Sequence, residues 1–187
     1  IKAGAKNCLK CSPCHIMNGY GGAGTLSDGK YNITTQFGGD LHNYVGVDKA
    51  MALMEYVDEV LCSMGGADAR LYSTASSELK TVALRNNLHL LEAKVRHLGT
   101  DRNVRILGKI FDFCRERIET EFYTTIENVD IEDDGSFLLT TNKGEQYRCK
   151  DLVMATGRSG SKWSAEICDK FGIRQRKNRV DIGVRVE

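Results

Sequence analysis

A glycine-rich stretch near the start of the chain, residues 18–30, constrains the fold more than any other feature. Its sequence is Asn-Gly-Tyr-Gly-Gly-Ala-Gly-Thr-Leu-Ser-Asp-Gly-Lys, with five glycines in thirteen residues. Glycine loses more backbone freedom on ordering than any other residue, so this stretch does not suit a helix or strand interior. A backbone that approaches a ligand closely and offers it N–H groups offsets that cost, as in loops that hold phosphates and dinucleotides. The alternative is a flexible surface loop.

The composition predicts a soluble globular protein. Of the 187 residues, 41% are hydrophobic and 27% charged, and the 26 basic residues nearly balance the 25 acidic ones. This balance leaves no global field to attract nucleic acid or an anionic membrane. No apolar run approaches the roughly 20 residues of a membrane span, and no secretory signal opens the chain. We therefore expect a cytoplasmic protein with a small-molecule substrate, and the sequence leaves its oligomeric state open.

Both ends of the sequence predict that the chain is an internal fragment. It begins with Ile1 instead of methionine, and residues 180–187 have the pattern of a strand with no stop signal. The seven cysteines are odd in number, and four of them are scattered through apolar or periodic segments. Scattered cysteines favour buried thiols in a reducing compartment over disulfides.

The other three cysteines, Cys8, Cys11 and Cys14, form a C-x-x-C-x-x-C cluster beside His15. Two-residue gaps let successive thiolates converge on one metal ion, and sulfur ligands suit zinc or an iron–sulfur cluster. Either site needs a fourth ligand, which for zinc would be His15 or a remote cysteine. A redox-active thiol pair is another interpretation, as are cysteines that bind nothing.

Hydrophobic periodicity predicts helices in the first two thirds of the chain. Apolar residues step by three and four from an N-cap at Asp48 to a stop at 65–66. A second helical pattern covers 76–85, with a turn at 86–87 and a short strand over 88–95. The strongest pattern follows residues 97–101 and places five side chains on one stripe. These are Val104, Leu107, Phe111, Cys114 and Ile118.

The period changes from 3.6 to two after Glu121, which predicts a β-meander. Its strands are expected at 122–129, 137–141 and 146–149, with turns at 133–136 and 142–145.

The next segment, residues 151–160, reads Asp-Leu-Val-Met-Ala-Thr-Gly-Arg-Ser-Gly. A near-continuous apolar run predicts a strand buried on both faces, as in a parallel sheet, and such sheets bind ligands at the carboxyl ends of their strands. The segment is thus a second candidate site. A helix over 163–171 closed by Gly172 and a last strand over 180–187 complete the prediction.

Five ordered motifs resemble those of a bacterial family of uncharacterised FAD-dependent dehydrogenases, which are two-dinucleotide-binding-domain flavoproteins of the NAD(P)/FAD-dependent oxidoreductase type. The motifs are C-x-x-C-x-P-C at 8–14, G-G-A-G-x-x-S-D-G-K at 21–30, G-T-D at 99–101, A-x-G-R-S-G at 155–160 and D-I-G-V-R-V-E at 181–187. Together they span nearly the whole chain, and their fixed order is far more specific than any one of them.

The resemblance implies an α/β fold of mixed α+β character. Residues 1–160 would form a partial FAD/NAD(P)-binding, Rossmann-like domain with flanking helices, the β-meander and a helical insertion over 45–98. Residues 161–187 would begin a second, substrate-type domain. The implied chemistry is hydride transfer through the flavin N5, to or from an unknown small molecule, with the protein supplying position and electrostatics. NAD(P) is a candidate redox partner.

The resemblance also implies which residues bind the cofactor. They are Gly22, Ala23, Gly24, Ser27, Asp28, Lys30, Ile126, Ala155, Thr156 and Gly157. Residues 22–27 would lie along the flavin side of FAD, and Asp28 or Lys30 would polarise the flavin or a substrate. Residues 155–157 would close over the cofactor near its ribose and pyrophosphate, and Ile126 would offer backbone to the adenine. No catalytic side chain is implied.

The chain departs from the family in two places. The strand–G-x-G-x-x-G–helix unit that holds the ADP pyrophosphate has no counterpart before residue 18, and the C-terminal segment of the FAD site has none either. We therefore expect the 187-residue chain to be inactive and to bind FAD weakly or not at all. The alternatives are a metal or iron–sulfur module built on the cysteine cluster, and a non-catalytic fragment that folds without cofactor.

Overall fold

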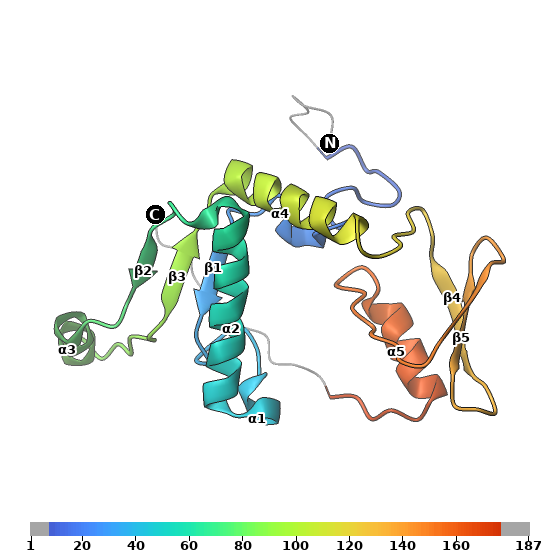
Figure 1. The fold of residues 1–187 in the computed structure, drawn as a ribbon. Coiled ribbons are helices and arrows are strands. Elements are labelled where there is room, and N and C mark those ends of the chain that lie inside the picture. Colours follow the sequence, from blue (N-terminus) through green and yellow to red (C-terminus); the bar gives the residue numbers. More distant parts are fainter. Residues whose placement is uncertain (1–7, 177–187) are drawn as a thin grey trace. The chain divides into compact units, whose positions relative to one another are not determined.

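The structure is a computed structural model that describes residues 8–176 in two compact units (Figure 1). Unit 1 is Ile1–Thr120 and unit 2 is Glu121–Glu187. The described residues form a mixed α/β structure with five α-helices and two antiparallel three-stranded sheets. The mixed α/β class is therefore confirmed, whereas the Rossmann-like domain and its boundary at residue 160 stay predictions.

The sheet of unit 1 follows the glycine-rich stretch directly. Its strands are β1 (Lys30–Ile33), β2 (Leu71–Ser73) and β3 (Lys94–His97), in the order β1-β3-β2 with both pairs antiparallel. The sequence predicted neither β1 nor β2, and β3 begins near the end of the strand predicted over 88–95. All three residues of β2 are exposed, so this edge strand lacks the alternation by which strands are recognised.

Helix α1 (His42–Val45) is followed after one residue by α2 (Val47–Leu61), which the π-helical turn η2 (Cys62–Gly66) continues. Gly46, at φ 84°, separates α1 from α2 and occupies the N-cap position predicted for Asp48, which lies in the first turn. The predicted stop is confirmed, because Gly65 has φ 116° and a Cβ on Gly66 would lie 2.8 Å from the Leu61 carbonyl oxygen.

Helix α3 (Ser77–Arg85) confirms the helix predicted over 76–85. The Ser76 hydroxyl caps it by accepting a hydrogen bond of 3.3 Å from the Leu79 N–H. Asn87, with φ 56°, provides the predicted turn. Within unit 1, α3 lies beyond the ends of β2 and β3, away from α2 (Figure 1).

Helix α4 (Thr100–Arg115) packs its buried side against the core of unit 1. The core consists of Leu61, Ala69, Leu98 and Ile106, with Tyr31, Met64 and Ile110 packed against it. Ile106 and Ile110 come from α4, so this helix joins the sheet to the end of α2.

A buried ion pair fastens α2 to the sheet of unit 1. The Arg96 guanidinium of β3 donates to both carboxylate oxygens of Asp58 at 2.5 and 2.8 Å, and to the Ala69 carbonyl oxygen at 2.5 Å. The side chains of Arg96 and Asp58 are only 10% and 13% exposed. A second pair between the same two elements, Lys94 and Glu55, lies at 3.0 Å but is about half exposed, at 50% and 48%.

Unit 2 confirms the predicted meander. Strands β4 (Ile126–Ile131), β5 (Phe137–Thr141) and β6 (Gln146–Cys149) are antiparallel in the order β4-β5-β6. Gly135 and Gly144 make the two turns with φ 81° and 78°. β4 begins four residues later than predicted, because its pairing starts where Ile126 faces Thr141.

Helix α5 (Ser161–Lys170) packs on β4 and ends as predicted at Gly172, whose φ is 64°. Ile167 is 5% exposed, and on β4 Val129 is fully buried. The Lys170 ammonium donates to the Val129 carbonyl oxygen at 2.7 Å and forms an ion pair with Asp130, also at 2.7 Å.

The buried strand predicted within residues 151–160 is wrong. Residues 151–156 are in no strand, and Val153 is 87% exposed. A strand buried on both faces needs a neighbour on each side and a layer over each face. In residues 8–176 both sheets are antiparallel and three-stranded, and neither includes this segment.

No helix within the described ranges is both long and apolar enough to cross a membrane. The strand predicted over 180–187 lies outside the described residues.

Candidate functional site

The glycine-rich stretch forms a series of tight turns. The 3-10 turn η1 (Gly22–Gly24) lies at its centre. The Gly22 N–H donates to the Gly19 carbonyl oxygen at 3.0 Å, the Thr25 N–H to Gly22 at 3.2 Å, and the Ser27 N–H to Gly24 at 3.2 Å. The glycines thus allow three consecutive tight turns within the loop.

The Asn103 side chain of α4 anchors the loop through hydrogen bonds to its backbone. This side chain is completely buried. The amide nitrogen donates to the carbonyl oxygens of Gly24 at 2.8 Å and Thr25 at 3.1 Å, while the amide oxygen accepts from the Tyr31 hydroxyl at 2.7 Å. Burial raises the pKa of Tyr31 above its ordinary value, so the hydroxyl remains a donor. One side chain thereby joins the loop, α4 and β1.

The packing around Gly29 leaves no room for a side chain at this position. The glycine is buried with φ +64°, and a Cβ there would lie 3.1 Å from the Cβ atoms of both Asn103 and Leu98. Its carbonyl oxygen accepts from the Leu98 N–H at 2.9 Å, and its N–H donates to the Ser27 hydroxyl at 3.2 Å. This glycine is therefore required without any ligand.

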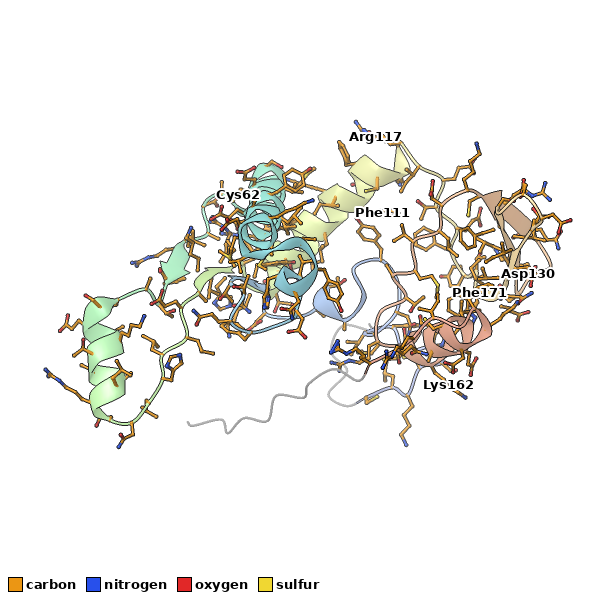
Figure 2. The ribbon with its side chains drawn as sticks, turned by 90° about the horizontal axis from the view of Figure 1, so that it is seen from below. Cys62, Phe111, Arg117, Asp130, Lys162 and Phe171 are labelled. Carbon is orange, nitrogen blue, oxygen red and sulfur yellow. The ribbon has the colours of Figure 1, made fainter. Side chains whose placement is uncertain are left out.

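A second stripe of α4 lies under the start of the loop. A Cβ on Gly21 would lie 3.2 Å from Leu107, and the Tyr20 ring lies 5.0 Å from that of Phe111 (Figure 2 labels Phe111). Burial and a hydrogen bond with Cys114 raise the pKa of Tyr20. Three residues of the predicted stripe thus face the loop, whereas the core is formed by the neighbouring stripe.

The two outer members of that predicted stripe are not buried. Val104 is 38% exposed, and Ile118 is 60% exposed and lies beyond the end of α4. The core is built on the neighbouring stripe, where Asn103, a polar residue in line with Ile106 and Ile110, is buried. A polar residue in register with a core stripe was the available signal for Asn103.

Gly24 differs from Gly21 and Gly29. Its φ is not positive, and a Cβ there would meet nothing within 4 Å. The residue is exposed, as are its neighbour Ala23 and Ser27. Neither the backbone conformation nor a neighbouring atom of the described residues requires glycine at this position.

Asp28 and Lys30 form an ion pair of 2.8 Å at the end of the loop. The pKa of Asp28 is lowered, chiefly by its hydrogen bond to Lys30, with smaller contributions from the charges of Lys30 and His97, while desolvation acts in the opposite direction. Both side chains are about half exposed, at 54% for Lys30 and 56% for Asp28. A cation and an anion are therefore accessible beside the glycine turns.

The other predicted cofactor residues belong to unit 2. Ala155, Thr156 and Gly157 are exposed, and the Thr156 hydroxyl lies 2.7 Å from that of Ser164. Ile126 is half-buried at the start of β4. The structure thus brings residues 22–30 together, while Ile126 and residues 155–157 lie in the other unit.

The three clustered cysteines do not form a ligand set. Cys8 and Cys14 are exposed, Cys11 is partly buried, and all three are free thiols. Within residues 8–176, no group of three His, Cys, Asp or Glu side chains is arranged to hold a metal ion. Metal binding at Cys8, Cys11 and Cys14 stays a prediction.

No protein-family model, curated protein or solved structure matches the chain.

Proposed function

We propose that the chain is a portion of an FAD-dependent oxidoreductase, with a Rossmann-like FAD-binding region, and that residues 22–30 contact the flavin. The observation that supports this most is Gly24. Gly24 lies in the exposed turn η1, has no positive φ, and leaves open space where a Cβ would lie, so a ligand can approach the peptide backbone there. A planar ring or phosphate lying against the backbone would occupy the space that a side chain on residue 24 would fill.

The surroundings of Gly24 fit such a ligand. Ala23 and Gly24 present a small, exposed surface, and Asn103 fixes the carbonyl oxygens behind it. Lys30 can place a positive charge beside an electron-rich ring, with Asp28 limiting its reach at 2.8 Å. Bound FAD would supply hydride transfer through its N5 atom. NAD(P) is the candidate redox partner, and the contacts predicted for Ile126 and residues 155–157, which lie in unit 2, stay predictions.

Replacing Gly24 by leucine tests the proposal directly. The backbone accepts the change and the space is open, so we expect the protein to fold normally while flavin contact is lost. The measurement is the perturbation of backbone amide resonances of residues 21–30 by millimolar FAD in the isotope-labelled 187-residue chain, since we expect weak binding.

Gly108 provides the matched control. It lies in α4, is exposed, has no positive φ, and a Cβ there also meets nothing within 4 Å. Gly108→Leu should leave the FAD perturbations unchanged. The proposal fails if FAD perturbs none of the loop amides in the unsubstituted chain, or if Gly24→Leu binds FAD as well as that chain does.

A further inference from the structure

We propose that Asn103 is a positioning residue that aims the Leu26 N–H away from α4, where it donates a hydrogen bond to an acceptor atom of the flavin ring. This inference rests on the proposed function. It assigns a specific donor atom to the ligand and a specific side chain to the task of orienting that donor.

The direction of the Leu26 N–H follows from the peptide plane. In a trans peptide the carbonyl of one residue and the N–H of the next point in opposite directions. The Thr25 carbonyl points at the Asn103 side chain, from which it accepts a hydrogen bond of 3.1 Å. The Leu26 N–H in the same peptide unit therefore faces away from Asn103.

The outward N–H is left without an internal partner. Among the described residues, the N–H groups of Leu26 and Asp28 form no hydrogen bond, whereas those of Gly22, Thr25, Ser27 and Gly29 donate within the loop. Of these two free donors, only that of Leu26 belongs to a peptide whose carbonyl is held by Asn103. An exposed N–H without a protein acceptor binds water or a ligand. The Leu26 N–H is thus available to a ligand that lies on the exposed side of η1.

The Asn103 amide cannot turn over without losing its contacts. Both of its donor positions face carbonyl oxygens, at 2.8 and 3.1 Å, and its oxygen faces the Tyr31 hydroxyl at 2.7 Å. A flipped amide would place its oxygen against the Gly24 and Thr25 carbonyl oxygens, and an amide oxygen has no hydrogen to donate. Tyr31 on β1 therefore secures the orientation of Asn103, and Asn103 secures that of the peptide between Thr25 and Leu26.

The chemistry of the donor defines the ligand atom. A neutral peptide N–H requires an acceptor, and the isoalloxazine ring offers carbonyl oxygens and unprotonated ring nitrogens. A phosphate oxygen is also an acceptor, so FMN and inorganic phosphate are used as separate probes. We expect FMN to perturb the Leu26 amide resonance and inorganic phosphate to leave it unchanged; the reverse pattern would overturn the assignment to the ring.

Three variants test the role of Asn103 in the labelled 187-residue chain. Asn103→Ala removes both donors and should weaken FMN binding at least tenfold, with loss of the Leu26 perturbation. Tyr31→Phe keeps the two donors but removes the partner of the amide oxygen, so it should give a smaller weakening and guards against misfolding of the first variant. Thr34→Val is the control, because Thr34 is also a buried polar residue of unit 1 but bonds the Glu92 carbonyl oxygen instead of the loop.

The outcomes separate the two proposals. If FMN perturbs no amide of residues 18–30 in the unsubstituted chain, the proposed function fails and this inference fails with it. If FMN perturbs the loop but not Leu26, or binds Asn103→Ala and Tyr31→Phe as tightly as the unsubstituted chain, only the role of Asn103 is overturned. Equal weakening by Thr34→Val would also overturn it, because the effect would then reflect general stability.

Discussion

Residues 18–30 and 151–160 both contain predicted contacts to the same cofactor, yet they differ in how the protein holds them. The first segment is fixed by the buried Asn103 amide and by three further residues of α4, while the second is largely exposed and has no place in either sheet. Each segment has a distinctive composition, but only the first is held by a buried side chain from a distant part of the chain. A local sequence pattern thus forms a fixed structure only where another segment of the chain packs against it.

The largest expected effect tests whether the first segment depends on the framework of unit 1. Arg96→Met leaves Asp58 buried without its partner, which should cost about 3–5 kcal/mol. Hydrogen exchange should accelerate throughout residues 18–30 and stay unchanged in residues 151–157. Lys94→Met, which breaks the exposed pair between the same two elements, should cost at most about 1 kcal/mol. Equal losses from the two variants would show that burial does not set the difference.

Two glycines with the same φ of +64°, Gly29 and Gly157, offer a closer comparison of the segments. Gly29→Ala adds the strain of a left-handed backbone, about 1–2 kcal/mol, to overpacking of about 1–3 kcal/mol against Asn103 and Leu98. Gly157→Ala carries only the backbone strain, because a Cβ there meets nothing within 4 Å. Chemical denaturation of the two variants measures the difference, and an equal cost would contradict the packing assigned to Gly29.

Removing the ammonium of Lys30 tests the charges at the end of the loop. Lys30→Met should raise the pKa of Asp28 toward its ordinary value, because the hydrogen bond from Lys30 is the main cause of the lowering. A carboxyl whose pKa is lowered by folding stabilises the folded state above its unfolded pKa, and this contribution is lost as the pH falls through the folded pKa. NMR titration of the Asp28 side chain measures the shift. An unchanged titration would mean that the pair does not persist in solution.

The smallest expected effect is at Val153. Because this side chain is 87% exposed, Val153→Ser should change the free energy of unfolding by no more than about 0.5 kcal/mol. A buried valine in a sheet would lose far more. Ile106→Ala, at a core position that is 1% exposed, is the matched reference and should cost about 2–5 kcal/mol. A large loss at Val153 would restore the strand predicted from the sequence.

The predicted elements that proved correct are those specified by neighbours in the chain. Helix α3 was predictable from its helical apolar pattern and the turn at residues 86–87, and the meander from its alternation and from the glycine turns at Gly135 and Gly144. Strand β2 was missed because it is entirely exposed and depends on pairing with β3, and the four-residue β1, although it alternates, was hidden beside the glycine-rich stretch. Such pairing leaves little trace in local periodicity.

The candidate site was predictable only in outline. The glycine content located residues 18–30, and the notable charges Asp28 and Lys30 were visible in the same motif. The role of Asn103 was not, because its partners Gly24 and Tyr31 are more than seventy residues away along the chain. The same limit applies to residues 151–156, because an apolar run does not show which other segment of the chain packs against it.

The position of Trp163 in α5 allows the unfolding of the two units to be followed separately by fluorescence. It is the chain's single tryptophan, and its indole N–H lies 3.4 Å from the Glu127 carbonyl oxygen at the start of the meander. Its fluorescence therefore reports loss of the contact between α5 and β4. Tyrosines, by contrast, lie mostly in unit 1, so comparing the two emissions during denaturation would reveal whether one unit melts while the other remains folded.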